Sequence, residues 1–394
     1  MLTWYSKKMR KLRFRLAVNW PAFGILVLLL WWPLGAQAEP YLAIQEGYKC
    51  SKCHVNMTGG GKRTDFANIY VQTRLANNFF DWRNVGKDTS EDADYEENPL
   101  KTDSKSSFFS GRLNDYIAIG ADFRWLLERT ETPDNPSENV FNQRKQNIYL
   151  EINLIPERLL FYTTFAGGGD AQEIFGLVQG ELLHEPYFVK VGQFFLPYGL
   201  RLQDDTAFVR AVTGFTYGTT DVGVEIGYEP GPWALHLAVT NGTGSSQETN
   251  DSKRLTASAA YVAKYFRLGG SYSSNKNTDG SDTDIYGLNG GAQFGRLGIL
   301  LAGDVIDDST VEQRVGILEF NFLVVRGNNV KLSYEYHDPN RDIFENANER
   351  YSLVYEPFLN QFTQIRTGVR FNDGIPQDPS LNTNSYFLEL HLFM

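Results

Sequence analysis

The chain has 394 residues, of which 42% are hydrophobic and 14% aromatic, and its 37 basic and 47 acidic residues give a net charge of −10. This acidic balance excludes a protein that binds the phosphate backbone of nucleic acid through a basic surface, so no nucleic-acid partner is expected. The 36 glycines, the many aromatic residues and the alternation of apolar with polar positions favour a protein built of β-strands.

The first 38 residues have the form of a secretory signal peptide. Six basic side chains and no acidic one precede an apolar stretch from Ala22 to Trp32, and Ala36-Gln37-Ala38 follows. The small-x-small sequence predicts cleavage after Ala38. An N-terminal membrane anchor and initiation at Met9 instead of Met1 are the alternatives. Cleavage leaves 31 basic and 47 acidic residues, a net charge of −16, on an exported protein.

Both cysteines of the chain lie in the run Cys50-Ser51-Lys52-Cys53-His54. A Cys-x-x-Cys-His run is the attachment site of a c-type haem, since its two thiols can add to the vinyl groups of one haem and its histidine can ligate the iron. A zinc site is one alternative, but it needs four ligands and the next histidine is His184. A disulfide-exchange site is another, although it normally begins a helix in a βαβ setting. We predict one covalent haem c bound by Cys50, Cys53 and His54.

The mature chain divides into a haem section at residues 39–86, an acidic polar linker at 87–111 and a strand-rich section at 112–394. Three glycines, Gly59 to Gly61, follow the haem-ligating histidine closely, and a short helix is predicted for residues 64–76. The linker is too rich in charged residues to bury the apolar surface that independent folding requires. It separates the two modules.

Sixteen strands are predicted from Arg112 onward. They span residues 112–127, 139–154, 158–166, 172–183, 186–195, 220–229, 231–241, 253–264, 265–275, 282–294, 296–305, 310–323, 328–339, 347–357, 360–372 and 383–394. Short turns are expected at 155–157, 184–185, 230, 265–266, 295, 326–327 and 356–358, and mostly longer polar loops alternate with them. This alternation on an even strand count is typical of an outer-membrane β-barrel, with a soluble sandwich as the alternative.

The two faces of the last predicted strand differ in polarity. One face holds Tyr386, Leu388, Leu390, Leu392 and Met394. The other face holds Phe387, Glu389, His391 and Phe393. The first face suits lipid and the second a lumen, and strands can span a bilayer only in a closed barrel. We therefore predict an all-β fold, a transmembrane antiparallel β-barrel of about sixteen strands in the outer membrane, with the small haem segment as a plug.

One loop differs from the others in composition. The stretch from Leu196 to Thr220 is far less polar than the other long loops, and it is the third loop on its side of the predicted barrel. In sixteen-stranded porins the third loop folds inward as a constriction. The sequence from Lys190 to Leu200 resembles the Gly-Gln-Phe…Pro-Phe-Gly-Leu signature of the phosphate-selective porin family. The candidate eyelet residues, which could equally be solvated charges near a loop tip, are Arg201, Asp204, Asp205 and Arg210.

The whole architecture resembles the fused monohaem cytochrome–porins of the outer membrane, which are best known as iron oxidases. Members tend to have Gln-x-Gly-x-x-Cys-x-x-Cys-His, which this chain matches at Gln45, Gly47, Cys50, Cys53 and His54. Their next helix contains Phe-Gly, where this chain has Phe66-Ala67. The triple glycine is a further departure from the iron-oxidase pattern.

The resemblance implies a haem section that plugs the barrel and electron transfer across the outer membrane. The expected partners are the lipid bilayer, a periplasmic electron carrier and an extracellular donor or acceptor, with ferrous iron as one donor, so Fe(II) oxidase activity is one expectation. A porin for small solutes, with the haem segment as plug or sensor, is the main alternative. A haem enzyme such as a peroxidase is another, which would need an open iron site.

The ligand opposite His54 on the haem iron is a separate question. Met57 lies too close in sequence to reach the opposite face. By strand direction, His391 points into the lumen near the periplasmic end, His236 near mid-barrel and His337 near the outer rim. We take His391 as the candidate distal ligand; a sixth position open to water would instead permit small-molecule chemistry at the iron.

Overall fold

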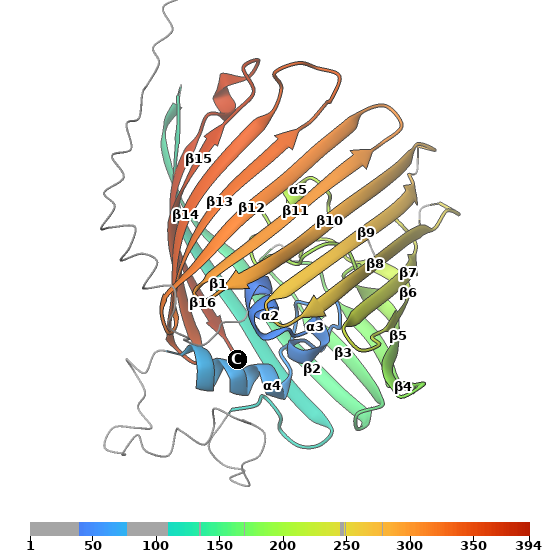
Figure 1. Ribbon diagram of the computed structural model, residues 1–394. Coiled ribbons are helices and arrows are strands. Elements are labelled where there is room, and N and C mark those ends of the chain that lie inside the picture. The colour runs from blue at the N-terminus through green and yellow to red at the C-terminus, as the bar shows by residue number, and fades with distance from the viewer. Residues whose placement is uncertain are drawn as a thin grey trace, which may run out of the picture.

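The computed structural model describes residues 39–76, 109–133, 135–168, 170–244, 248, 250–277 and 279–394. The predicted signal peptide and most of the predicted linker lie outside these residues. Sixteen strands form one closed antiparallel barrel, in which β1 pairs with both β2 and β16 (Figure 1). Closure leaves no unpaired strand edge to face lipid, and it confirms the predicted fold class.

The strands of the barrel have the following bounds. They are β1 Ile117–Thr132, β2 Asn135–Ile155, β3 Leu159–Phe165, β4 Ile174–Leu182, β5 Glu185–Phe194, β6 Asp221–Tyr228, β7 Trp233–Thr240, β8 Arg254–Ala263, β9 Phe266–Lys276, β10 Asp282–Phe294, β11 Leu297–Asp307, β12 Glu312–Val325, β13 Asn328–Asp338, β14 Asn348–Asn360, β15 Thr363–Asp373 and β16 Asn384–Phe393. Most ends lie within a few residues of the predicted ones.

The predicted start of the first strand at Arg112 is wrong. The strand begins at Ile117 instead, because Asn114 accepts hydrogen bonds through Oδ1 from the backbone N–H groups of Tyr116 and Ile117. An asparagine that bonds its own backbone in this way makes a turn in place of a ladder. The chain therefore bends before it enters the barrel wall.

The predicted turn at 356–358 is also wrong, because β14 continues to Asn360 and the chain turns after it. A proline usually argues against a strand interior, since it has no N–H to donate. Pro357 lies opposite Asn328, at the end of the ladder between β13 and β14, which is a place where a strand tolerates proline.

The predicted alternation of faces is confirmed. In β7 every second side chain is exposed, as Trp233 and Leu237 are, and those between them are buried. In β16 Leu388 is exposed, whereas Glu389 and His391 are buried in the lumen. The outward face is therefore apolar and the inward face polar, as the two sides of a membrane barrel require. Within the described ranges, no helix is both long and apolar enough to cross a bilayer.

Residues 39–76, which we call the plug, fold into short helices inside the barrel. These are α2 Pro40–Glu46, α3 Cys50–Cys53, α4 Asp65–Tyr70 and the π-helical turn η1 Val71–Leu75. Pro40 begins α2 and Gly47 ends it in the left-handed region at φ 69°, a typical pairing of start and stop residues. Thr64 caps α4 by accepting a hydrogen bond from the Ala67 N–H, which confirms the predicted helix.

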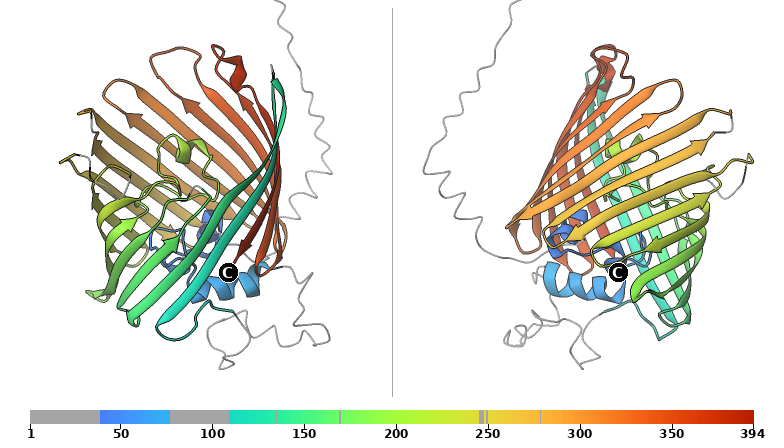
Figure 2. Two further views of the ribbon diagram at one scale, coloured as in Figure 1. Left: turned by 180° about the vertical axis from the view of Figure 1, so that it is seen from behind. Right: turned by 45° about the vertical axis from the view of Figure 1, so that its right-hand side comes forward.

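The plug lies at the end of the barrel that carries the short turns (Figures 1 and 2). The Tyr265 N–H, in one short turn, donates a 2.9 Å hydrogen bond to the Ile44 carbonyl. Arg326, in another, donates a 2.6 Å bond to the Thr73 carbonyl. Since short turns face the periplasm in outer-membrane barrels, the plug closes the periplasmic mouth.

Residues 195–220, which we call L3, fold inward as predicted. L3 joins β5 to β6, yet its short helix α5, Phe208–Ala211, packs against β11, β12 and β13 on the other side of the lumen. Its apolar side chains Leu202, Ala207 and Val209 are buried there. L3 thus lies across the lumen above the plug. Another loop, between β15 and β16, carries the 3₁₀ turn η4, Pro379–Leu381.

Candidate functional site

A large cavity lies between the plug, L3 and the inner wall of the barrel. Its free space is about 1740 Å³, a volume that includes the part open to solvent. Cys50, Cys53 and His54 all line this cavity. The structure therefore brings the three predicted haem-binding residues to one space, inside the lumen and beneath L3.

The segment before His54 is anchored to a periplasmic turn. Lys49 Nζ donates a 2.7 Å hydrogen bond to the Glu229 carbonyl, and the Ser51 hydroxyl donates a 2.8 Å bond to Glu229 Oε2. Glu229 is itself buried, between β6 and β7. Lys49 and Ser51, the two neighbours of Cys50 in the chain, thus both bind Glu229, which fixes the orientation of α3.

The segment after His54 is anchored to the neighbouring part of the wall, at the start of β4 and on β5. Asn56 is fully buried, and its amide donates a 2.6 Å hydrogen bond to Glu173 Oε1 and accepts a 2.9 Å bond from Lys190 Nζ. Lys190 also forms a 2.6 Å ion pair with Glu225. A buried charge keeps a single orientation when it is fully paired, so this network holds the chain on the far side of the histidine.

The three glycines after the haem motif permit a close approach to L3. Gly59, Gly60 and Gly61 all have positive φ, from 68° to 96°. A Cβ on Gly60 would lie 2.9 Å from Arg201 Cδ and from a ring carbon of Tyr217, and one on Gly61 would lie 2.6 Å from a wall tyrosine hydroxyl. Only glycine fits both the conformation and the space at Gly60 and Gly61.

The cavity holds His54 and Cys53 in their neutral forms. Burial, followed by the charge of Arg63, lowers the pKa of His54 to about 4, so the imidazole is uncharged at neutral pH, as an iron ligand must be. Its Nδ1 is enclosed and has no hydrogen-bond partner. Burial, followed by Cys50, raises the pKa of the Cys53 thiol to about 12, which is the opposite of the lowered pKa that a disulfide-exchange cysteine needs.

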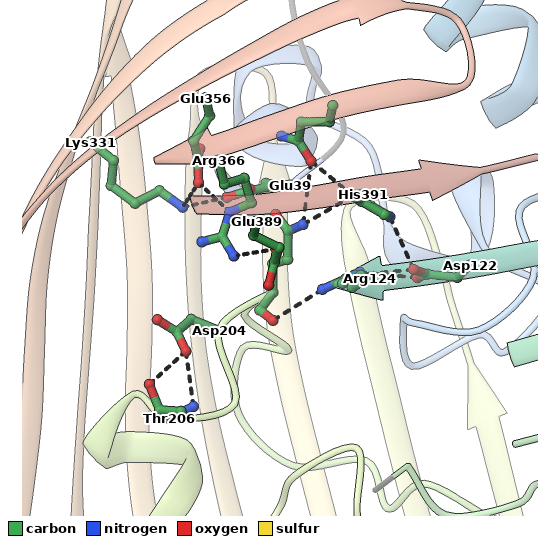
Figure 3. Close-up of polar contacts among 12 residues, drawn as sticks. Glu39, Asp122, Arg124, Asp204, Thr206, Lys331, Glu356, Arg366, Glu389 and His391 are labelled. Atoms are coloured by element: carbon green, nitrogen blue, oxygen red, sulfur yellow. Dashed lines mark hydrogen bonds and ion pairs between the residues drawn. The ribbon is translucent and has the colours of Figure 1, made fainter. Parts of the chain in front are cut away.

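The candidate distal ligand His391 also lines the cavity, but both of its ring nitrogens have neighbours. Nδ1 lies 2.9 Å from Gln364 Oε1, and Nε2 lies 3.0 Å from Asp122 Oδ1 (Figure 3). His236, which lines the cavity too, lies 3.2 Å from Glu225 through Nδ1. Either histidine would have to give up one such partner in order to ligate iron.

His337 and His184 lie away from the cavity, whereas Met57 lines it. His337 contacts Gln313 on the barrel wall at 3.2 Å. His184 sits in the turn between β4 and β5 with a φ of 66°. Among the described residues, no group of three or more His, Cys, Asp and Glu side chains is arranged to hold a metal ion.

The candidate eyelet residues of L3 divide between ion pairs and the cavity. Asp204 pairs with Arg370 of the wall, and Asp205 forms a 2.9 Å ion pair with Arg210. Arg201 instead lines the cavity beside the plug. Burial, followed by the charge of Arg210, lowers the pKa of Arg201 to about 10.

A ladder of buried charges connects L3 and the plug to strands β13 to β16 (Figure 3). Lys331 binds Glu39 of the plug at 2.6 Å, and Arg366 lies between Glu356, at 2.8 Å, and Glu389, at 3.0 Å. Such fully paired charges stabilise one arrangement of the inner parts. The alternation of the strands predicted that this face would be polar, but the pairing across strands depends on the register.

The residues present fit a covalently bound haem. Two thiols and a neutral imidazole line one cavity, whose lining also includes apolar groups such as Leu42, Met57 and Phe358 and several arginines. An apolar surround with a few cationic side chains suits a flat macrocycle with charged carboxylates.

The fold and the lumen define a porin-like outer-membrane β-barrel, and the comparisons with known proteins agree. A family model described as "Gram-negative porin" matches residues 193–336, from L3 into β13. The fold is similar to an anion-selective porin from Comamonas acidovorans, with 11% identity, a TM-score of 0.55 and coverage of 71% of this chain and 99% of that chain. The fold is also similar to OmpT of Vibrio cholerae, with 11% identity, a TM-score of 0.53 and coverage of 72% of this chain and 99% of that chain.

A third solved structure, OmpF of Salmonella typhi in complex with daunomycin, is 9% identical with a TM-score of 0.55 and covers 72% of this chain and 99% of that one. The search of curated proteins found no match. Identities this low show a common fold only. The match to the Gram-negative porin model, together with the closed barrel, confirms the predicted location in the outer membrane.

The residues that dock the plug could not be recognised in the sequence. Asn56 and Lys62 in the plug, and Glu173 and Glu229 on the wall, gave no recognisable motif. A polar residue at every second position of a strand signals a lumenal side chain, but it does not identify the partner. The triple glycine was noted, and a close approach of backbone is what such a run signals.

Proposed function

We propose that this protein transfers electrons at the outer membrane through one haem c, attached to Cys50 and Cys53 and ligated by His54. The observation that carries the proposal is that these three side chains line one large lumenal cavity and belong to a segment anchored on both sides by buried contacts. A haem bound there supplies one-electron redox chemistry. The chain supplies the two thiols, the axial imidazole and an enclosure that limits water.

The plug lies nearer to the periplasmic end of the barrel than to the outer end, so an electron that crosses the membrane would cover unequal distances before and after the haem. The plug lies at the short-turn end of the barrel, which faces the periplasm, so a haem bound to it would lie on the side from which a periplasmic electron carrier approaches. An extracellular donor, for which we propose ferrous iron, is separated from the cavity by L3. Since the apolar core of the bilayer is about 30 Å thick, a redox group inside the lumen shortens the distance that each transfer must cover.

Haem attachment is the first test. The full chain is produced in a Gram-negative host with a cytochrome c maturation system, and the membrane fraction is stained for haem after a denaturing gel. We expect a stained band for the wild type and none for Cys50→Ser/Cys53→Ser, while both show the heat-modifiable mobility of a folded barrel. An unstained wild-type band in a host that matures a control cytochrome overturns the proposal.

The donor is tested separately. The haem-loaded protein is reconstituted in liposomes, and external ferrous iron is mixed with it while the haem absorption bands are followed by stopped flow. Reduction of the haem with one ferrous ion oxidised per haem supports ferrous iron. Reduction by dithionite but not by ferrous iron at any pH excludes the iron donor and leaves electron transfer from another partner.

A porin for small solutes is the second candidate, favoured by the match of L3 and the following strands to the porin family and by the inward course of L3. Planar bilayer recordings distinguish the two. A steady open conductance in protein that lacks haem, together with no redox exchange across the membrane, favours the solute porin.

A further inference from the structure

The cationic side chains that line the plug cavity fall into two groups. Lys49, Arg124 and Lys145 each have a carboxylate partner, with closest distances of 3.8 Å to Glu229, 3.0 Å to Asp122 and 2.9 Å to Asp170 respectively. The second group is Arg63, Arg201 and Arg267. None of the ion pairs found among the described residues includes an arginine of this second group.

The guanidinium groups of these three arginines keep N–H groups that are free to bind a ligand. Arg201 donates one hydrogen bond, of 2.8 Å, to the Leu196 carbonyl, while its Nε is enclosed without a partner. The Nε of Arg267 is likewise enclosed without a partner. Arg63 packs its guanidinium over the Phe393 ring, 4.1 Å from the centroid. All three residues are half-buried. A guanidinium group that is removed from water is normally paired with a carboxylate or phosphate, because an unpaired charge is costly to desolvate.

The unpaired arginines approach the thiols and the histidine from different elements. The position of a Cβ on Gly59 lies 3.6 Å from Cys50 Sγ and 3.9 Å from Arg201 Cβ, so Arg201 enters the cavity from L3 beside that thiol. Arg63 forms a β-bridge with His54 within the plug. Arg267 comes from β9 on the wall. The three cations thus come from the plug, L3 and the wall, and all of them line the cavity that also contains the two thiols.

We infer that Arg63, Arg201 and Arg267 form a carboxylate-binding site, and that its occupants are the two propionates of the haem attached at Cys50 and Cys53. This inference rests on the proposed function. Arginine can bind a carboxylate through two parallel hydrogen bonds, and three guanidinium groups are enough to neutralise two propionates. L3 then contacts the cofactor directly through Arg201, so the constriction loop and the haem form one unit.

A free organic carboxylate is the other source of the same chemistry, as expected if the protein is a solute porin. The position of the site argues for the haem, because Arg63 is joined to the haem motif and Arg201 lies beside Cys50. The experiment therefore has one arm for each source.

The first arm uses haem-loaded full-length protein in detergent. Arg63→Gln, Arg201→Gln and Arg267→Gln are compared with wild type, with Arg201→Lys, which keeps the charge, and with Arg296→Gln, on the turn between β10 and β11 and outside the cavity. The readouts are the propionate bending bands in resonance Raman spectra and the haem midpoint potential. Loss of a nearby positive charge stabilises oxidised haem relative to reduced haem. The Gln variants should therefore have a lower midpoint potential and changed Raman bands.

The expected result is a shift in at least Arg63→Gln and Arg201→Gln, a smaller one in Arg201→Lys and none in Arg296→Gln. Haem-loaded Gln variants with unchanged bands and potential overturn the inference and leave the proposed function intact. Heat-modifiable mobility of every variant shows that the barrel is folded, so a shift does not arise from misfolding.

The second arm uses the same variants made without haem, in planar bilayers with succinate. If the wild type takes no haem in vivo, and succinate reduces its current but not that of the Gln variants, the occupant is a free carboxylate and the assignment to haem is overturned. If it takes no haem and succinate has no effect, the carboxylate site itself is overturned.

Discussion

Lys62 of the plug forms a 3.0 Å ion pair with Glu151 of β2, and 1% and 8% of their side chains are exposed. The pair lies directly after the triple glycine, so it fixes the far end of the segment that carries the haem motif. Replacing both members of a buried pair with apolar residues is often tolerated, whereas removing one leaves an unpaired buried charge.

Lys62→Met should therefore loosen the plug, at a cost of about 3 to 5 kcal/mol, while Lys62→Met/Glu151→Met recovers much of that loss. The rate at which a thiol reagent modifies Cys50 in haem-free protein measures the docking. We expect fast modification in the single variant and slower modification in the double variant. Equal rates in the two would mean that the pair does not hold the plug.

Gly60→Ala should undock the plug more than Gly214→Ala does. Both glycines have nearly the same positive φ, 82° and 78°, so each alanine carries a similar backbone cost of roughly 1 to 2 kcal/mol. Only at Gly60 would the new Cβ meet Arg201 and Tyr217, because nothing lies within 4 Å of that position at Gly214. Thermal unfolding and Cys50 modification compare the two variants, and similar losses in both would refute the close approach.

The pairing of Asp204 makes L3 sensitive to acid. Burial alone would raise the pKa of this carboxyl, but Arg370, then Arg350 and Arg366, hold it well below its ordinary value of 3.8. A depressed pKa contributes stability above the ordinary value, and this stability is lost as the pH falls below 3.8 toward the lowered pKa. Hydrogen exchange of L3, corrected for intrinsic rates, should therefore increase in that range.

Asp204→Asn should expose L3 to exchange at neutral pH as well, with a local loss of about 1 to 3 kcal/mol, and the dependence on acid should flatten. If the wild type and Asp204→Asn respond equally to acid, another group controls the loop.

Leu288 tests the membrane-facing side of the barrel. Its side chain is 69% exposed near the middle of β10, whereas Phe344 is 86% exposed in the loop between β13 and β14. Arginine at the mid-plane of a bilayer costs about 2 to 4 kcal/mol, so Leu288→Arg should reduce assembly into the outer membrane and Phe344→Arg should not. Heat-modifiable mobility of membrane fractions measures both, and equal assembly would place Leu288 outside the lipid zone.

The strands could be predicted because the chain alternates strongly between apolar and polar residues, as in β7 and β16. The same pattern does not predict where a strand ends when side-chain hydrogen bonds take the place of the hydrogen bonds between strands. Asn114 shortens the first strand through its own hydrogen bonds, and Pro357 is accommodated at a ladder end. The place of Pro357 depends on pairing with another strand, and the alternation of residues does not show that Asn114 will bind its own backbone.

The Cys-x-x-Cys-His run could be recognised in the sequence because its spacing is itself the signal, and the haem that it predicts stays a prediction. Their surroundings could not, since Glu229, Glu173 and Glu151 reach the plug only through the register of the barrel. The arginines around the cavity come from the plug, L3 and β9, three elements that are far apart in the sequence. A cluster of this kind becomes visible only after closure.

The closing seam of the barrel also implies an order of biogenesis. Ala121 and Met394 exchange two backbone hydrogen bonds of 3.0 Å, which join the first strand to the end of the chain. The plug precedes every strand in synthesis and in export, and the C-terminal residue completes the wall around it. We expect a cofactor to be attached while the plug is still outside a closed wall. Attachment of the proposed haem would then come before insertion, and a barrel that closed too early would lack it.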